Sequence, residues 1–169
     1  SGDNYTCAAE ENGQFFICLS DGMGSGLEAS RESETVVDTL EQLVEAGFSG
    51  ETAAKMVNSV LNLKNRNGRF STVDISIVDL YSGMCHFLKA GAATTFIKRS
   101  RWVEAISSTS LALGLVQQAD FESSTKKLYE GDFLIMVTDG VLDALPGEKP
   151  EETMKEIIME VNTTAAQEL

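Results

Sequence analysis

The sequence is poor in the residues on which several kinds of active site depend. Its 169 residues include one histidine, two prolines and three cysteines. A single histidine gives little support to an imidazole-rich zinc site or to a Ser-His-Asp triad. The cysteines are odd in number, lack CxxC spacing and, at Cys18 and Cys85, fall within apolar runs. We therefore predict buried reduced thiols, which favour a cytoplasmic location.

Positive charge and long hydrophobic runs are also scarce. Lys and Arg number 13 against 26 Asp and Glu, giving a net charge of −13. This balance argues against sequence-independent nucleic-acid binding and against an anionic membrane surface. No run approaches the roughly 18 apolar residues of a membrane span, and no signal peptide opens the chain. We expect no nucleic-acid partner and no membrane contact. The start at Ser1 without methionine suggests a fragment, and one interpretation is the cytosolic domain of a membrane-anchored parent.

What is present is enough apolar sequence for one compact domain, since 43% of the residues are hydrophobic. Apolar residues recur at helical spacing over 27–46, and Ser49 has the character of an N-cap for a second helix reaching Leu63. A third helix is predicted after Pro150. Strands are predicted at 14–20, 73–78, 84–89, 94–98, 102–106, 121–128 and 133–137. This order indicates an α+β fold with helices layered on a long antiparallel meander.

Two aspartates share one sequence setting. Asp21 and Asp139 each follow an apolar strand and precede a glycine, and Asp3 lies in a Gly-Asp pair near a strand. Mg²⁺ and Mn²⁺ prefer oxygen ligands, and two such ions can activate water beside a phosphoryl group. A plain turn is nevertheless the commoner role of an isolated Asp-Gly pair. Spacing alone leaves both interpretations open.

The glycine turn that follows Asp21 has a second interpretation. A strand, then Gly22, Gly24 and Gly26, then a helix is superficially similar to a dinucleotide-binding turn. However, Asp21 would place negative charge beside the pyrophosphate. A second helix also follows where a βαβ unit requires a strand. The metal interpretation is therefore preferred.

Other polar residues give weaker signals. Ser25 sits in a Gly-Ser-Gly turn like a nucleophile elbow, but nothing marks His86 as its base, so a flexible turn is the better interpretation. His86 itself is expected to be a core or strand-surface histidine. The segment from Ser71 to Asp74 has hydroxyls and a carboxylate at a strand start, where local capping or a supporting role around metal ions are both open.

In chain order, the motifs resemble the protein phosphatase 2C-type (PPM) family and, within it, a sporulation branch. The resemblance covers essentially the whole chain and implies an αββα four-layer sandwich, two antiparallel sheets flanked by helices, with residues 1–169 in a single domain. The matching motifs are Gly2-Asp3, Asp21-Gly22-Met23-Gly24, Ser71-Thr72, Leu113-Gly114 and Thr138-Asp139-Gly140-Val141-Leu142-Asp143.

The resemblance also implies a metal-dependent serine/threonine protein phosphatase with two Mn²⁺ or Mg²⁺ ions. Asp21 would bridge both ions and the Gly22 carbonyl would bind one of them. Asp139 would bind the other ion, and Asp3 would act through a coordinated water. The implied substrate is the phosphoserine of an anti-anti-sigma factor-like protein, in sporulation control of sigma-factor activation. The helices at 27–46 and 49–63 resemble the family's regulatory switch element.

Two features depart from the family pattern. The C-terminal Asp-Asp-Met-Thr motif, which carries another metal carboxylate, is absent before Leu169. We therefore expect weak binding of the ion held by Asp139, little activity from this fragment and an incomplete sheet. No basic residue near the N-terminal motif is expected to hold the substrate phosphate. The alternative is a non-catalytic phosphoprotein-binding or dimerising module on the same fold, and a homodimer is also considered.

Overall fold

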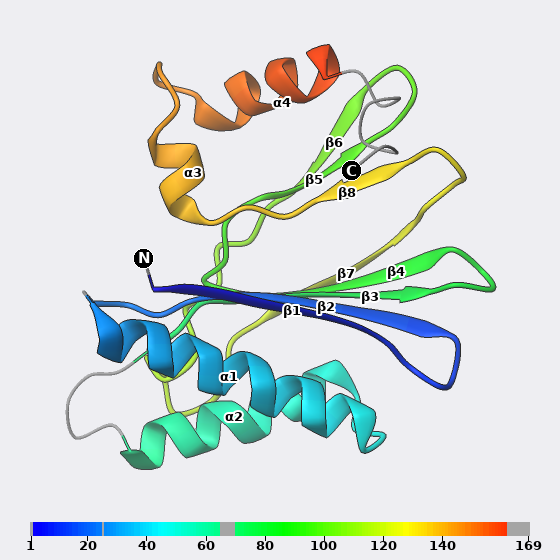
Figure 1. The fold of residues 1–169 in the computed structure, drawn as a ribbon. Coiled ribbons are helices and arrows are strands. Elements are labelled where there is room, and N and C mark those ends of the chain that lie inside the picture. Colours follow the sequence, from blue (N-terminus) through cyan, green and yellow to red (C-terminus); the bar gives the residue numbers. More distant parts are fainter. Residues whose placement is uncertain (1, 25, 65–69, 162–169) are drawn as a thin grey trace. The chain divides into compact units, whose positions relative to one another are not determined.

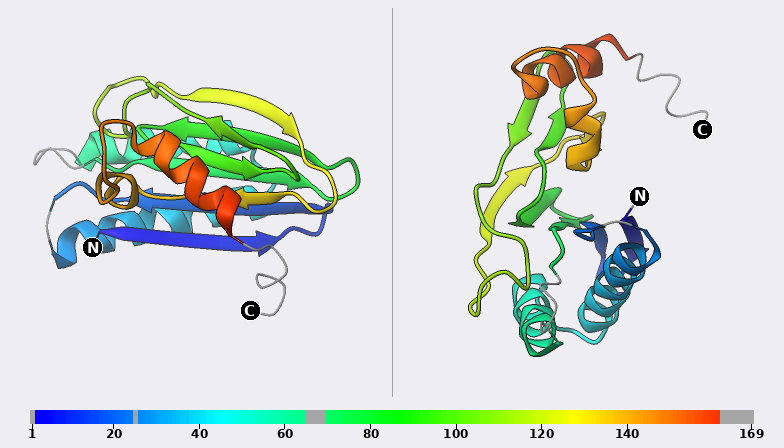
Figure 2. Two further views of the ribbon diagram at one scale, coloured as in Figure 1. Left: turned by 90° about the horizontal axis from the view of Figure 1, so that it is seen from above. Right: turned by 90° about the vertical axis from the view of Figure 1, so that its left-hand side faces the viewer.

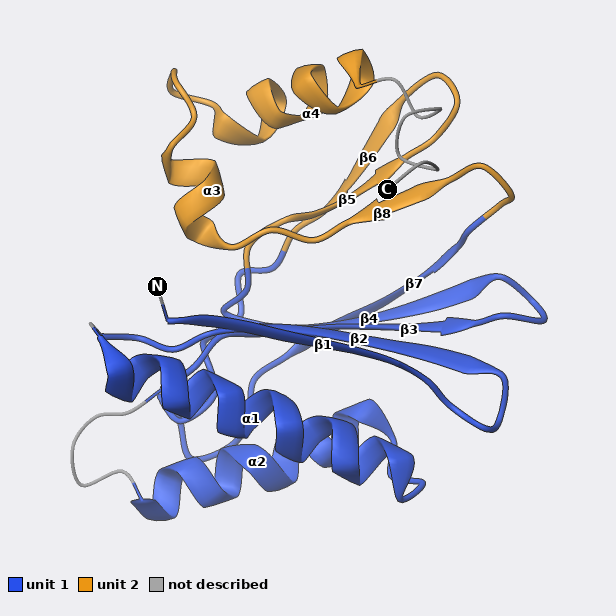
Figure 3. Cartoon of the chain, in the orientation of Figure 1, with its two compact units in different colours: residues 1–92, 108–128 blue, residues 93–107, 129–169 orange. Residues whose placement is uncertain are grey.

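The computed structural model describes residues 2–24, 26–64 and 70–161. The chain divides into two compact units (Figure 3). Unit 1 comprises residues 1–92 and 108–128, and unit 2 comprises residues 93–107 and 129–169. Each unit contains one antiparallel sheet and its own helices (Figure 1). The predicted α+β class is therefore confirmed.

Unit 1 is built on a five-stranded antiparallel sheet of order β1-β2-β3-β4-β7. Side chains alternate between the two faces of a strand, and Phe16 and Cys18 point into the helix-side core together with Ile75 and Leu88. The five strands are β1 (Asp3–Ala9), β2 (Gln14–Asp21), β3 (Val73–Asp79), β4 (Met84–Ala90) and β7 (Glu122–Lys127).

Two helices, α1 (Leu27–Glu45) and α2 (Gly50–Lys64), cover one face of this sheet (Figure 2). The chain turns out of helix α1 at Gly47, whose φ of 97° lets the Phe48 N–H donate to the Leu43 carbonyl at 3.1 Å. Helix α2 begins with the predicted cap, since the Ser49 hydroxyl accepts the Thr52 N–H at 3.1 Å.

Unit 2 contains a three-stranded antiparallel sheet of order β6-β5-β8 and two helices. Phe96 packs with Leu142, Met154 and Ile158 in a separate small core. Pro150 occupies the first turn of the last helix, as predicted. The elements are β5 (Thr95–Lys98), β6 (Val103–Ile106), β8 (Phe133–Ile135), α3 (Asp139–Asp143) and α4 (Pro150–Glu160).

The strand order corrects the predicted continuous meander. After β4, the chain leaves the first sheet for β5 and β6, and β7 then returns to pair with β4. Strand β1 and helix α3 were not predicted, and β8 is shorter than the predicted 133–137. Within the described ranges, no helix has both the length and the apolar character needed to cross a membrane.

Candidate metal centre

Two of the predicted metal ligands lie side by side in unit 1. Asp3 of β1 is the direct partner of Asp21 of β2 in the antiparallel register. Residues directly opposite each other point to the same face, with Cβ atoms about 5 Å apart. That face is the one turned away from α1 and α2, because Phe16 and Cys18, which alternate with it, enter the helix-side core. The register therefore brings both carboxylates to one place.

The main chain of Asp21 is fixed by the start of the neighbouring strand. Its N–H donates to the Thr72 hydroxyl at 3.0 Å, and its carbonyl accepts the Thr72 N–H at 2.9 Å. The Ser20 hydroxyl donates to the Thr72 carbonyl at 2.7 Å. Thr72 thus bonds across the sheet to the candidate ligand, which agrees with the supporting role considered for this segment rather than with a local cap.

Two glycines allow the backbone to approach closely at this end of the sheet. A Cβ on Gly2 would lie 2.6 Å from the Gly22 carbonyl oxygen and 3.2 Å from Asp21 Oδ1. A Cβ on Gly22 would lie 2.2 Å from the Ala29 carbonyl oxygen. Any side chain at either position would therefore clash with its surroundings. The glycine requirement has a direct steric cause.

The donors in unit 1 fit a hard divalent cation. Two carboxylates and a main-chain carbonyl are the oxygen ligands that Mg²⁺ and Mn²⁺ prefer, with water completing the shell. Among the described residues, no group of three or more His, Cys, Asp or Glu side chains is placed to hold a metal ion. The candidate set formed by Asp3, Asp21 and Gly22 therefore contains two carboxylates and one main-chain carbonyl.

Asp139 belongs to unit 2, and its local structure differs from the prediction. Strand β8 ends at Ile135, and Asp139 is the first residue of the five-residue helix α3. The Val141 N–H donates to the Thr138 carbonyl at 3.0 Å, which closes the first turn. Asp139 is therefore not in a strand-end turn like that of Asp21. Its Asp-Gly pair starts a helix instead.

A buried ion pair lies on the same face as Asp21. Lys89 Nζ is 2.7 Å from Asp74 Oδ2, and the two side chains are 1% and 2% exposed. Asp74 pairs with Leu19, two residues before Asp21. Asp74 was considered from the sequence, but Lys89 was not. The sequence signal for Lys89 was its position, because it falls on the same face of β4 as Cys85 and Phe87, which are buried.

The remaining candidates have structural roles. His86 is exposed on β4 with its Nδ1 3.0 Å from the Thr125 hydroxyl, so it is a strand-surface histidine as predicted. Ser25 lies outside the described residues. Cys18 and Cys85 are buried free thiols, which confirms their prediction. Burial raises the pKa of both, that of Cys85 to about 12, so they stay protonated at neutral pH.

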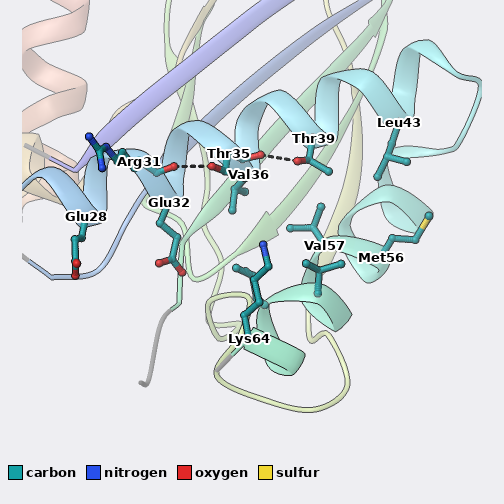
Figure 4. Close-up of a pocket in the computed structure, with 12 residues that line it drawn as sticks. Glu28, Arg31, Glu32, Thr35, Val36, Thr39, Leu43, Met56, Val57 and Lys64 are labelled. Carbon is teal, nitrogen blue, oxygen red and sulfur yellow. Dashed lines mark hydrogen bonds between the residues drawn. The ribbon is translucent and has the colours of Figure 1, made fainter. Parts of the chain in front are cut away.

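Unit 1 also has a groove between its helices, with a volume of about 450 Å³ (Figure 4). Leu43 of α1 and Met56 and Val57 of α2 form an apolar part, while Glu28 and Lys64 contribute charge. All of its lining comes from α1 and α2. The groove is therefore distinct from the face of the sheet that bears Asp3 and Asp21.

Comparison with known proteins supplies the family. The chain matches the model of Stage II sporulation protein E (SpoIIE) over residues 11–169. It is 36% identical over 143 residues to Stage II sporulation protein E of Bacillus subtilis (strain 168), covering 85% of this chain and 17% of that protein. With the same protein of Priestia megaterium, identity is 34% over 170 residues, covering 100% of this chain and 29% of that protein. The chain belongs to the SpoIIE family. It spans less than a third of the length of these two relatives.

Solved structures agree with this assignment. The PP2C phosphatase domain of SpoIIE from Bacillus subtilis, solved with a fragment of its regulatory domain, has a TM-score of 0.86 and 33% identity. That match covers 96% of this chain and 47% of the solved one. RsbX, solved in complex with magnesium, shares the fold with a TM-score of 0.71 at 20% identity, over 95% of this chain and 73% of that one. The resemblance to a sporulation branch of the PP2C-type family is therefore confirmed.

Proposed function

We propose that this chain is a metal-dependent serine/threonine protein phosphatase domain. The observation that carries the proposal is the pairing of Asp3 with Asp21 beside the Gly22 carbonyl, which Gly2 can approach closely because it has no side chain. Two carboxylates placed directly opposite each other repel, and a cation between them would remove that repulsion. Membership of the SpoIIE family supports the same chemistry.

The proposed metal set consists of Asp3, Asp21, Gly22 and Asp139. Asp21 would bridge two Mn²⁺ or Mg²⁺ ions, with the Gly22 carbonyl binding one and Asp139 the other, and Asp3 would act through a coordinated water. Ions of this kind activate water as a nucleophile and offset the negative charge of a transferring phosphoryl group. Within the chain, Thr72 orients Asp21, because the Thr72 hydroxyl accepts the Asp21 N–H and the Thr72 N–H donates to the Asp21 carbonyl.

The αββα four-layer sandwich is part of the proposal. Each sheet has its own pair of helices, α1 and α2 in unit 1 and α3 and α4 in unit 2. The match to the SpoIIE phosphatase domain extends over 96% of the chain. We include a single phosphatase domain over residues 1–169 in the proposal.

The proposed substrate is a phosphoserine on an anti-anti-sigma factor-like protein, in the cytoplasm and in sporulation control. The support is the family, together with a charge argument. A chain with a net charge of −13 repels a negatively charged phosphate group. Electrostatic attraction by bound cations would therefore be the main interaction that draws in and positions the phosphate.

The test is release of phosphate from a phosphoserine protein by a longer protein that contains this chain, measured with and without Mn²⁺, because little activity is expected of the fragment alone. We expect Asp21→Asn and Asp139→Asn to lower the rate by at least about a hundredfold, because each removes a charged metal ligand. Matched controls are Asp79→Asn, at a strand end with a turn, and Asp143→Asn, in the same helix as Asp139. Both controls should keep the rate of the unsubstituted chain.

Full activity in both ligand variants would overturn the metal assignment. A chain that binds the phosphoprotein and Mn²⁺ yet never releases phosphate would instead support the non-catalytic binding module. Dimer formation, measured by light scattering in the same samples, would show whether that module also joins two copies.

A further inference from the structure

We propose that Asn58, in the middle of α2, is a positioning residue that links this helix to the ligand-bearing end of β2. The link runs through the loop at 108–121 and then through Ser71. It consists of hydrogen bonds that all lie within unit 1. The consequence of this link for metal binding rests on the proposed function, whereas the hydrogen-bonded link itself does not.

Asn58 is buried and directs its whole amide to one loop. It is 1% exposed. Its Oδ1 accepts the Gly114 N–H at 2.8 Å, and its Nδ2 lies 3.3 Å from the carbonyls of Val116 and of Gln117. A buried amide is costly unless it is hydrogen-bonded, so these bonds make the position of the loop depend on Asn58.

The next step joins the loop to the strand start. The Leu113 N–H donates to the Ser71 carbonyl at 2.9 Å, and the Ser71 N–H donates to the Leu113 carbonyl at 3.1 Å. On its other side, Ser71 forms a bridge with Gly22. The Met23 N–H donates to the Phe70 carbonyl at 3.1 Å. The short segment 70–72 therefore lies between the loop and the candidate ligands Asp21 and Gly22.

A second side chain of α2 also holds this loop, since Asn62 Nδ2 donates to the Val116 carbonyl at 2.8 Å, but Asn58 bonds nearest to Leu113, at Gly114. Apart from the bridge at Leu113, residues 107–121 form no helix or strand. One anchor lies before Leu113, where the Ser110 hydroxyl donates to the Lys89 carbonyl at 2.8 Å. Asn58 supplies the anchor after it, at Gly114, whose φ of 90° suits glycine. Leu113 is therefore held in register from both sides.

The test compares Asn58→Leu with Val57→Ala by amide hydrogen exchange in the metal-free chain. Val57 lies on the same helix, is also buried and belongs to the apolar core, so it controls for a general loss of stability. With Asn58→Leu we expect exchange to quicken by about tenfold at Leu113, and by a similar factor at Asp21 and Met23. Val57→Ala should leave the exchange of these three amides unchanged relative to the rest of the sheet.

A conservative variant tests which bond matters. Asn58→Ser keeps an uncharged hydroxyl acceptor for the Gly114 N–H, so exchange at Asp21 and Met23 should stay within about threefold of the unsubstituted chain. This variant also serves if Asn58→Leu does not fold. Two results would overturn the proposed link. One is faster exchange in Asn58→Leu that is confined to the amides of residues 114–117. The other is an Asp21 amide that exchanges equally fast in Asn58→Leu and in the conservative variant.

Mn²⁺ titration of the same variants separates the link from the proposed function. If Asn58 positions the metal ligands, the affinity for Mn²⁺ should fall about tenfold in Asn58→Leu and not in Val57→Ala. Equal affinities in the two variants would overturn the effect on the metal site. Failure of the unsubstituted chain to bind Mn²⁺ would contradict the proposed function, and the exchange experiment would still decide on Asn58.

Discussion

The two ends of the five-stranded sheet each have an aspartate as the last residue of a strand, and the two are used differently. At one end, Asp79 of β3 accepts the N–H of Tyr81 at 2.8 Å and of Ser82 at 3.1 Å, which closes the turn into β4. At the other end, Asp21 is held by its main chain, and its side chain lies opposite Asp3.

The comparison separates a structural aspartate from a candidate ligand. The two N–H donors lower the pKa of Asp79, so its charge is stabilised by the turn itself. Asp21 has a second carboxylate directly across the strand pair, where like charges repel and a bound cation would be favoured. Strand-end position alone therefore does not distinguish a candidate metal ligand from a turn residue, and the residue across the sheet is the feature that differs.

The largest stability effect is expected for the ion pair at the Asp21 end of the sheet. Lys89→Met would leave Asp74 buried without its cation, which should lower the free energy of unfolding by about 3–5 kcal/mol. The control is Lys55→Met, whose pair with Glu51 on α2 is more than half exposed and should cost about 0.5 kcal/mol or less. Urea denaturation measures both, and equal small losses would show that the pair does not stabilise this end.

Thiol reactivity tests whether either end opens in the native state. Cys7 is exposed, whereas Cys18 lies in the middle of the sheet and Cys85 pairs with Val78, next to Asp79. With a coloured aromatic disulfide, we expect Cys7 to react at least about a hundredfold faster than the other two, because burial keeps them protonated and inaccessible. Cys85 reacting as fast as Cys7 would mean that the Asp79 end opens readily.

The smallest effect is expected at the turn. Because the pKa of Asp79 is lower in the folded chain, its stabilisation is present above the ordinary carboxyl range and is lost as pH falls through the lowered pKa. Asp79→Ala should therefore lower the melting temperature slightly at neutral pH, and the difference should vanish in acid. Asp79→Asn, which keeps an acceptor, should depend less on pH. A difference that persists unchanged in acid would exclude the carboxylate as its source.

Local signals were enough to predict the elements around Asp21. Three of these signals act over a few neighbouring residues: the apolar run of β2, the glycine turn after it and the cap at Ser49. Each can therefore be recognised from a short stretch of sequence. The stop at Gly47 is of the same kind. The strand end that positions Asp21 could therefore be predicted, whereas its partners could not.

What could not be predicted depends on contacts between distant segments. β1 is an edge strand with little apolar alternation, so neither the strand nor the pairing of Asp3 with Asp21 was evident. Helix α3 has five residues, too few to show a period of 3.6. The role of Lys89 follows from its cross-strand partner, and the assignment of β7 to the first sheet follows from pairing with β4.

The central claim is that the Asp21 end of the sheet binds metal and the Asp79 end does not. Calorimetric titration of Mn²⁺ into the unsubstituted chain, Asp21→Asn and Asp79→Asn tests it most directly. We predict the same affinity for the unsubstituted chain and Asp79→Asn, and an affinity at least about a hundredfold weaker for Asp21→Asn. Asp21→Asn binding Mn²⁺ as tightly as the unsubstituted chain would contradict the account.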